Sequence, residues 1–87
     1  MFFFAYTKQK GSFSVNADHI TDLAISPYDE ERGALVAFMD SGITLTLSPF
    51  DSYKNINELL RRVTNCLNNG EMDFSIRFLL NNISTES

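Results

Sequence analysis

His19 is the only histidine and Cys66 the only cysteine in this chain of 87 residues. These two side chains limit the catalytic and metal-binding chemistry that the sequence could support. A Ser/His/Asp or Cys/His arrangement would need His19 as its base, and no pattern marks a nucleophile for it. A zinc site would need carboxylates to complete one Cys and one His, and the four glycines lack the spacing of a phosphate-binding loop. We therefore predict no catalytic residue, no metal and no cofactor.

Cys66 falls within an apolar pattern that favours a structural role. Apolar residues between positions 56 and 67 recur at spacings of three and four, which gathers them into one stripe of a helix. Burial in such a stripe raises the pKa of a thiol and suppresses its reactivity. We therefore predict that Cys66 belongs to the core. The members of the stripe are Ile56, Leu59, Leu60, Val63, Cys66 and Leu67.

Acidic side chains concentrate between residues 18 and 40, where Arg32 is the only lysine or arginine. The whole chain has a formal net charge of −4 and lacks the positive footprint that binding to phosphate backbones requires. Direct binding to nucleic acid is therefore disfavoured. The acidic stretch either faces a basic partner or supplies the solvated turns and outer positions of a sheet. Its members are Asp18, Asp22, Asp29, Glu30, Glu31 and Asp40.

Three aromatic residues have no evident place in the core pattern. Tyr28 stands beside the acidic run at 29–31, and Phe50 and Tyr53 flank the junction between a strand and a helix. Exposed Tyr and Phe are enriched at protein interfaces, because they bring large contact area with few rotamers to freeze. The alternative is that each ring packs on its own domain. The predicted partner-binding residues are Tyr28, Asp29, Glu30, Glu31, Phe50 and Tyr53.

A change in hydrophobic period indicates the elements that must position these residues. From 43 to 47, apolar residues alternate with Thr or Ser, which is typical of a half-buried strand. After Pro49 the period lengthens to about 3.6 residues, which predicts a helix over about 53–68 with Asp51 or Ser52 as N-cap. The helix needs an apolar surface to cover, and the inward face of a sheet is the nearest one. We therefore predict the α+β class, with a small antiparallel sheet of four to five strands packed on one amphipathic helix.

The strands themselves are predicted from alternation and from turn residues. Ile20 is out of phase with the strand that follows it, which indicates an irregular start or a bulge. Residues 34–39 are apolar at odd-numbered and even-numbered positions alike, which favours a central strand covered on both faces. Residues 40–42 form a hairpin turn in which Gly42 is free to take a positive φ. The predicted strands cover about 1–7, 12–15, 20–26, 34–39 and 43–47.

The segment from 72 to 80 fits two patterns. A strand would place five alternating apolar residues on one face. A helix would gather a set that includes Ile76, Leu80 and Ile83, and would leave Phe74 and Phe78 on the opposite side. The strand is favoured and a second helix is the alternative. Residues 82–87 are expected to fray.

The length of the chain allows one domain, residues 1–87. A single cysteine excludes an intramolecular disulfide, which favours a reducing, cytoplasmic location. The apolar opening at 1–6 is too short to cross a membrane and is read as a strand, so we expect no membrane association.

Three function classes fit these features. The favoured one is a small non-catalytic protein-binding module, an adaptor or inhibitor with a protein partner, that also forms a homodimer. A free edge beside the strand at 2–6 would be a template for that pairing. The alternative is an acidic nucleic-acid mimic that occupies the basic groove of a DNA- or RNA-binding protein, and the third class is a small enzyme using His19. Compact acidic proteins without enzymatic signatures are also frequent among phage and mobile-element products that bind host proteins.

Overall fold

The structure, a computed structural model, describes residues 1–86. It confirms the α+β class, with short strands followed by two helices. In chain order the elements are β1 (Phe2–Thr7), β2 (Gly11–Asn16), a 3-10 helix η1 (Ala17–His19), β3 (Ile20–Pro27), β4 (Arg32–Met39), β5 (Thr44–Thr46), β6 (Asp51–Ser52), α1 (Tyr53–Asn68) and α2 (Ile76–Glu86).

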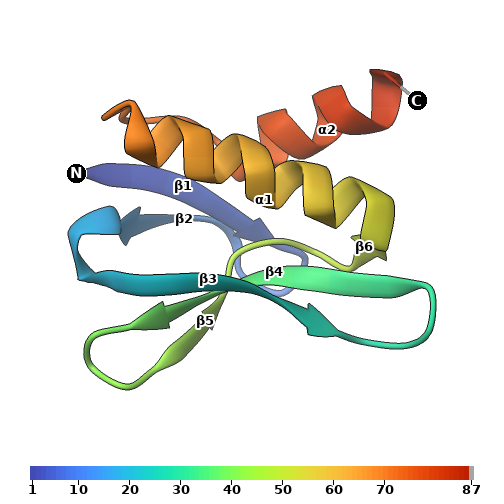
Figure 1. Cartoon of the computed structure of the whole chain (residues 1–87), viewed down its shortest axis with the longest axis horizontal. Coiled ribbons are helices and arrows are strands. Elements are labelled where there is room, and N and C mark those ends of the chain that lie inside the picture. The colour runs from blue at the N-terminus through green and yellow to red at the C-terminus, as the bar shows by residue number, and fades with distance from the viewer. Residues whose placement is uncertain (87) are drawn as a thin grey trace.

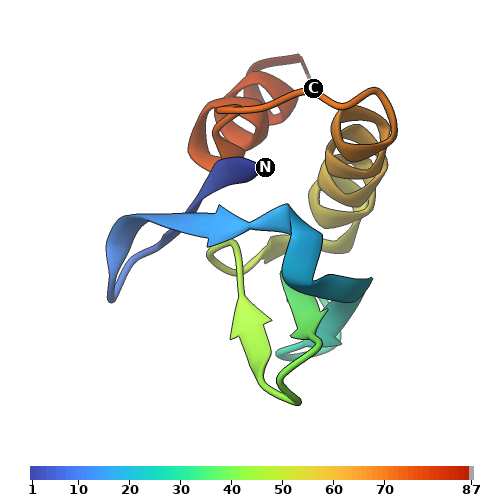
Figure 2. The same cartoon turned by 90° about the vertical axis from the view of Figure 1, so that its left-hand side faces the viewer.

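The strands form two antiparallel sheets rather than the single sheet expected. One is the β1–β2 hairpin, and the other has the order β3–β4–β5, with β6 paired to the start of β4. Figure 1 shows both helices on the upper side, the β3–β4–β5 sheet at the bottom and the β1–β2 hairpin between them. The turned view in Figure 2 shows the same order of layers. The β1–β2 hairpin packs against α2, whereas α1 packs directly on β3 and β4 of the larger sheet.

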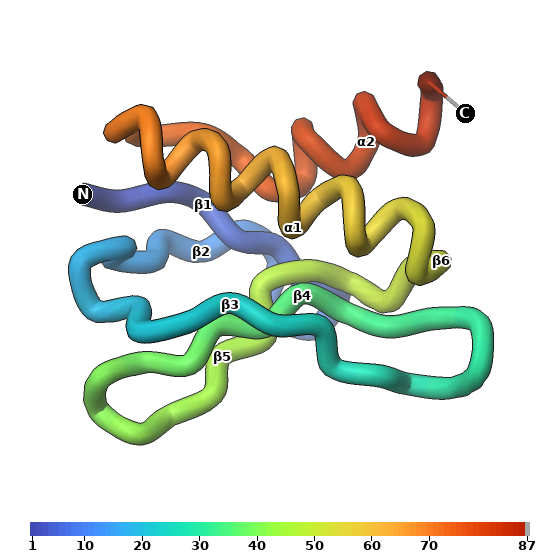
Figure 3. The backbone as a smooth tube through the Cα atoms, in the orientation of Figure 1, coloured from blue at the N-terminus to red at the C-terminus, as the bar shows by residue number. Residues whose placement is uncertain are grey.

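The second edge of β1 is occupied, so the expectation of a free edge beside this strand is wrong. Asp73 N–H donates to Phe2 C=O at 2.9 Å, and Phe4 N–H donates to Phe74 C=O at 2.9 Å. The tube in Figure 3 shows the segment between α1 and α2 returning alongside β1. Phe2 C=O, Phe4 N–H and Tyr6 N–H are therefore already bonded within the chain and are not available to pair with a second copy.

The predicted hairpin turn at 40–42 and the irregular start of β3 are confirmed. The pairing of β3 with β4 shifts register between Ile20 and Asp22, and residues 33–37 of the central strand β4 are buried. Gly42 has a φ of +90° and donates its N–H to Met39 C=O at 2.9 Å. Ile43 differs from its predicted inward position, because it lies at the tip of this hairpin and is 61% exposed.

Helix α1 follows the predicted pattern. Ser52 is the N-cap, and its hydroxyl accepts from Asn55 N–H at 3.2 Å. Gly70 ends the helix region with a φ of +70°. The fully buried residues of the helix are Ile56, Leu59 and Val63.

The prediction that the segment from 72 to 80 is a strand is wrong, because residues from Ile76 onward form the helix α2. Phe74 precedes the helix and stacks on Phe3, with ring centroids 4.8 Å apart and an interplanar angle of 4°. Phe78, which the strand pattern turned inward, is 65% exposed. Residues 82–86, expected to fray, are helical and bury Ile83; Ser87 lies outside the described residues.

Both sheets and both helices contribute to one core, as the two layers of a small domain require. The inner side of the β1–β2 hairpin meets α2, and α1 covers β3 and β4. The buried cluster consists of Phe3, Ala5, Val15, Leu35, Ala37, Leu47, Ile56, Leu59, Val63, Ile76, Leu80 and Ile83.

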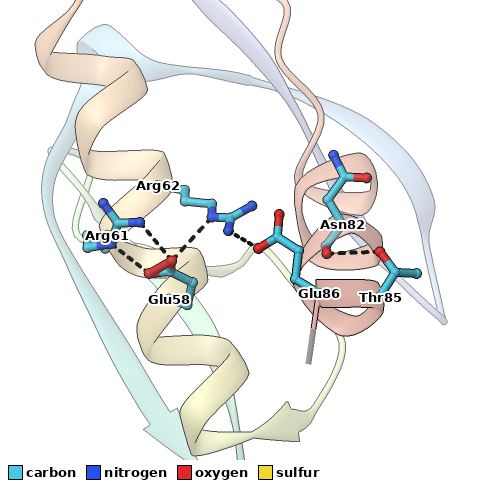
Figure 4. A network of polar contacts seen from close by, with 6 residues as sticks. All are labelled: Glu58, Arg61, Arg62, Asn82, Thr85 and Glu86. Atoms are coloured by element: carbon cyan, nitrogen blue, oxygen red, sulfur yellow. Dashed lines mark hydrogen bonds and ion pairs between the residues drawn. The ribbon is translucent and has the colours of Figure 1, made fainter.

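A charged network joins the outer sides of the two helices (Figure 4). Arg61 donates to both oxygens of Glu58 at 2.6 and 2.7 Å. Arg62 donates to Glu58 at 3.3 Å and pairs with Glu86 of α2. These bonds, with that from Arg61 the strongest, lower the pKa of Glu58 from 4.5 to about 2.

The low pKa of Glu58 predicts a specific pH dependence. A carboxyl whose pKa is lower in the folded than in the unfolded chain stabilises the fold above the unfolded pKa, and this contribution is lost as pH falls through the folded pKa. We therefore expect Glu58→Gln to be less stable than wild type at neutral pH and the difference to vanish as the pH approaches 2. Urea midpoints measured across this range check it. Glu30→Gln is the control, because Glu30 is exposed. If the urea midpoint of Glu58→Gln stays as far below that of wild type at the lowest pH as at neutral pH, the low pKa of Glu58 is wrong.

Candidate functional site

An aromatic and cationic cluster lies at the turn between β3 and β4. The rings of Tyr28 and Phe50 are in contact, with centroids 4.4 Å apart and planes tilted by 35°. The guanidinium of Arg32 lies 5.1 Å from the centroid of the Tyr28 ring, within the range of a cation–π interaction. The turn thus brings Tyr28 against Phe50, as the prediction of one partner-binding set requires.

Asp29 organises this turn. One carboxylate oxygen accepts from the N–H groups of Glu31 and Arg32, both at 2.8 Å, and the other pairs with the Arg32 guanidinium at 3.1 Å. These bonds, with the backbone bond from Glu31 the strongest, lower the pKa of Asp29. Asp29 is therefore a structural residue of the turn, whereas the carboxylate of Glu30 has no hydrogen bond within residues 1–86.

Tyr53 ties the start of α1 to the same turn. Its hydroxyl donates to Asp29 C=O at 2.6 Å, and its N–H donates to Glu31 C=O at 3.3 Å. The ring lies against Gly33, where an added Cβ would come within 2.8 Å of the ring atom Cε1. Tyr53 thus packs on its own domain and holds Tyr28 and the acids in place, instead of presenting its own ring to a partner.

A groove of about 560 Å³ opens beside this cluster. We call it the β5 groove. Its walls are the β1–β2 turn at residues 7–10 on one side and β5 on the other, and Tyr28, Arg32 and residues 48–50 complete it. Figure 2 shows the β1–β2 turn and β5 facing each other from different sheets. β1 and the segment that follows β5 meet where Tyr6 N–H donates to Leu47 C=O at 3.0 Å. Beyond that bond the two segments separate.

The lining of the β5 groove is cationic although the whole chain is acidic. Lys8, Lys10 and Arg32 contribute three of the seven lysines and arginines of the sequence. Arg32 is paired with Asp29, whereas Lys8 and Lys10 make no ion pair with a carboxylate within residues 1–86. Lys10 lies 5.3 Å from the centroid of the Phe13 ring. Two uncompensated positive charges therefore border the groove.

The edge of β5 that faces away from β4 is unpaired within residues 1–86. Met39 N–H donates to Ile43 C=O at 2.9 Å and Leu47 N–H donates to Leu35 C=O at 2.8 Å, and Leu45, which is paired with Ala37, lies between them in the same phase, so its N–H and C=O groups point toward β4. Directions alternate along an antiparallel strand. The N–H and C=O groups of Thr44 and Thr46 consequently point away from β4, on the side that the groove borders.

The sequence did not single out Lys8, Lys10, Thr44 or Thr46 as site residues. Their local signals are ordinary, since lysines are common in turns and threonines in strands. What joins them is the contact of the two sheets near Leu47, which is a tertiary feature. The predicted residues Tyr28, Asp29, Glu31, Phe50 and Tyr53 do lie together in the structure, and Glu30 lies beside them in the exposed turn.

His19 lies at the opposite end of the β3–β4 hairpin from the cluster of Tyr28, Phe50 and Arg32. Its Nδ1 is 2.9 Å from an Asp40 carboxylate oxygen, and both side chains are more than half exposed. Among the described residues, Asp40 is the only hydrogen-bond partner of the His19 ring.

Burial, and to a lesser extent Glu71, raises the pKa of the Cys66 thiol to about 11, so the thiol is protonated at neutral pH and a poor nucleophile.

The acidic residues of the stretch from 18 to 40 lie at the two ends of the β3–β4 pair, except Asp22, which is exposed within β3. Asp18, whose carboxylate pairs with the amino group of Met1 at 3.0 Å, and Asp40 flank one end of the β3–β4 pair. Residues 29–31 form its other end, about 20 Å away at the rise of a β-strand. The acidic residues are therefore spread along the β3–β4 pair, and the nucleic-acid mimic stays a prediction from the sequence.

Within residues 1–86 no three His, Cys, Asp or Glu side chains are grouped so that they would hold a metal ion. Neither helix of the described chain has the length and apolar character to cross a membrane. No protein family, curated protein or solved structure matches the sequence or the fold.

Proposed function

We propose that the protein is a non-catalytic protein-binding module, an adaptor or inhibitor, that holds its partner in the β5 groove. The observation that carries this proposal is the coincidence of three features in one place. An unpaired strand edge, an exposed aromatic pair and two uncompensated lysines border the same groove. Each of these features is used in protein recognition, through backbone pairing, apolar contact and charge complementarity.

The exposure and rigidity of the aromatic pair support this proposal. Tyr28 is 59% exposed and Phe50 is 51% exposed, yet their rings are held together and braced by Arg32. The bonds of Asp29 and Tyr53 fix the turn that carries Tyr28. A surface that is ordered before binding loses less conformational entropy when a partner arrives. Self-association stays a prediction from the sequence.

Affinity capture with matched variants tests the proposal. The tagged chain is incubated with an extract of the cells that produce it, and the captured proteins are quantified. We expect Tyr28→Ser/Phe50→Ser to reduce capture by more than about tenfold, because exposed aromatic anchors carry a large share of binding energy. Thermal unfolding of the variant confirms that it remains folded.

The control is Phe2→Ser/Phe78→Ser, which removes two aromatic rings of similar exposure, 51% and 65%, from outside the groove. We expect this control to capture its partners as wild type does. Equal capture by the groove variant and wild type, or loss of capture in the control alone, would refute the proposal.

A further inference from the structure

We infer that the occupant of the β5 groove is an extended, acidic segment of a partner protein that adds to β5 as a new strand. The inference rests on the proposed function and deepens it, because it names the conformation and the charge of the bound segment. Its basis is the direction of the free backbone groups of β5, the shape of the space in front of them and the charges on the opposite wall.

The backbone of β5 selects an extended peptide. Thr44 and Thr46 direct their N–H and C=O groups away from β4, as follows by alternation from the β4–β5 register and the bond from Met39 N–H to Ile43 C=O at 2.9 Å. Such a row of donors and acceptors is satisfied by a second strand about 4.8 Å away, and peptide recognition by strand addition uses this geometry. A helical segment has its backbone groups already paired and gains nothing from this edge.

The space beside β5 is open for such a strand. The β1–β2 turn at residues 7–10 is the opposite wall of a groove of about 560 Å³. Beyond the bond from Tyr6 N–H to Leu47 C=O, β1 and β5 separate instead of pairing. A strand inserted there would add a further strand to the β3–β4–β5 sheet beside β5 and fill the gap between the two sheets.

The opposite wall selects an acidic segment. Lys8 and Lys10 border the groove without a carboxylate partner within residues 1–86, and Arg32 stands at the end where Tyr28 and Phe50 lie. Carboxylates on the inserted strand would meet these lysines in a partly enclosed space, where charge pairs are screened less than on an open surface. The ring pair would receive an apolar side chain of the same segment.

The same charges and backbone groups disfavour two other occupants. A second copy that pairs β5 with β5 about a twofold axis would bring the Lys8 and Lys10 of both copies toward one another. A nucleic-acid strand offers no backbone N–H donors to match the C=O groups of Thr44 and Thr46. An acidic peptide satisfies both the strand edge and the lysines.

Fluorescence anisotropy with defined peptides tests this inference on the intact chain. The probe is a labelled octapeptide in which Glu and Val alternate, and the comparison peptide alternates Lys and Val. We expect the Glu/Val peptide to bind at least about tenfold more tightly than the Lys/Val peptide. Lys8→Glu should weaken its binding by about tenfold, whereas Lys54→Glu, a reversal on α1 beside Glu58, should change it by less than about twofold.

Methylation of peptide nitrogens separates strand addition from simple charge attraction. In an added strand, the N–H groups of every second residue point to β5 and the others point away. We therefore expect N-methylation of one alternating set to weaken binding by about tenfold or more, and N-methylation of the other set to be tolerated. Equal effects of the two sets would overturn strand addition, and equal binding of the Glu/Val and Lys/Val peptides would overturn the preference for acidic segments.

Two further outcomes would overturn the inference. One is tighter binding of a labelled single-stranded oligonucleotide than of the Glu/Val peptide. The other is a dimer in sedimentation that dissociates on Thr46→Pro, which would place a second copy on β5. If the inference fails while capture still depends on Tyr28 and Phe50, the proposed function survives; if capture is also unchanged in that groove variant, both fail.

Discussion

Replacing Leu59 with alanine is expected to lower the free energy of unfolding by about 2 to 5 kcal/mol. Leu59 is fully buried in the middle of α1, on the face that packs on β3 and β4 and beside α2. The change removes apolar contacts and leaves a cavity that the two sheets and two helices cannot easily fill. A domain of this size has only about 4 to 13 kcal/mol of stability in total, so this single truncation removes a large part of it.

Urea denaturation measures the Leu59→Ala effect as a fall in midpoint at similar slope. Ile43→Ala is the matched control, because Ile43 is apolar but 61% exposed at the tip of the β4–β5 hairpin. We expect the control to stay within about 0.5 kcal/mol of wild type. A Leu59→Ala variant as stable as the control would mean that α1 does not close the core.

Gly33→Ala is expected to destabilise the protein by about 1 to 3 kcal/mol, or more if the turn cannot shift. The added Cβ would lie 2.8 Å from Tyr53 Cε1 and 2.9 Å from Ser26 C=O oxygen, and 3.1 Å from Ile25 Cγ2. One of these neighbours is backbone of the adjacent strand β3, so a side-chain rotation cannot relieve every contact. The expected shift of Tyr53 would also break its hydroxyl bond to Asp29 C=O.

Two variants isolate the cause of the Gly33→Ala effect. Tyr53→Phe removes the hydroxyl bond alone, and we expect it to cost about 1 kcal/mol. Gly42→Ala places a Cβ where no atom lies within 4 Å but at a φ of +90°, so it reports the cost of backbone strain, about 1 to 2 kcal/mol. If thermal and urea unfolding show Gly33→Ala to be as stable as wild type, the packing of α1 against the β3–β4 turn described above is wrong.

The parts of the fold that the sequence predicted are those fixed by local pattern. The stripe of Ile56, Leu59 and Val63 defines α1 because burial follows the helical period. The turn at 40–42 is recognisable because glycine there takes a positive φ. Such features depend on neighbours a few residues away, so they survive whatever the rest of the chain does.

The parts that the sequence did not predict depend on distant partners. Phe74 and Phe78 look equivalent by alternation, but Phe74 stacks on Phe3 while Phe78 is left in water. A small domain has too little interior to bury every apolar side chain. Alternation alone does not show which of them stay exposed, so it favours a strand where the structure has α2. The division into two sheets likewise follows from backbone bonds of β1 to residues 73–75 and to Leu47, which carry no side-chain signature.

The candidate site was predicted in part for the same reason. Tyr28 and Phe50 stood out because each is aromatic among polar neighbours, and the structure joins them. The sequence predicts Asp29 as a partner-binding acid or a solvated turn residue, whereas in the structure its carboxylate closes the turn. Lys8 and Lys10 become site residues only when the β1–β2 turn is placed opposite β5, a relation between two sheets that no local spacing encodes.

Amide spectra of the isotope-labelled chain titrated with the Glu/Val octapeptide show whether recognition takes place at the free edge of β5. We predict that the largest shifts fall at Thr44, Thr46 and residues 8–10, with slower hydrogen exchange at the Thr44 and Thr46 amides. Shifts confined to β2, to the free edge of β3 or to the His19 region, with unchanged exchange in β5, would contradict the claim.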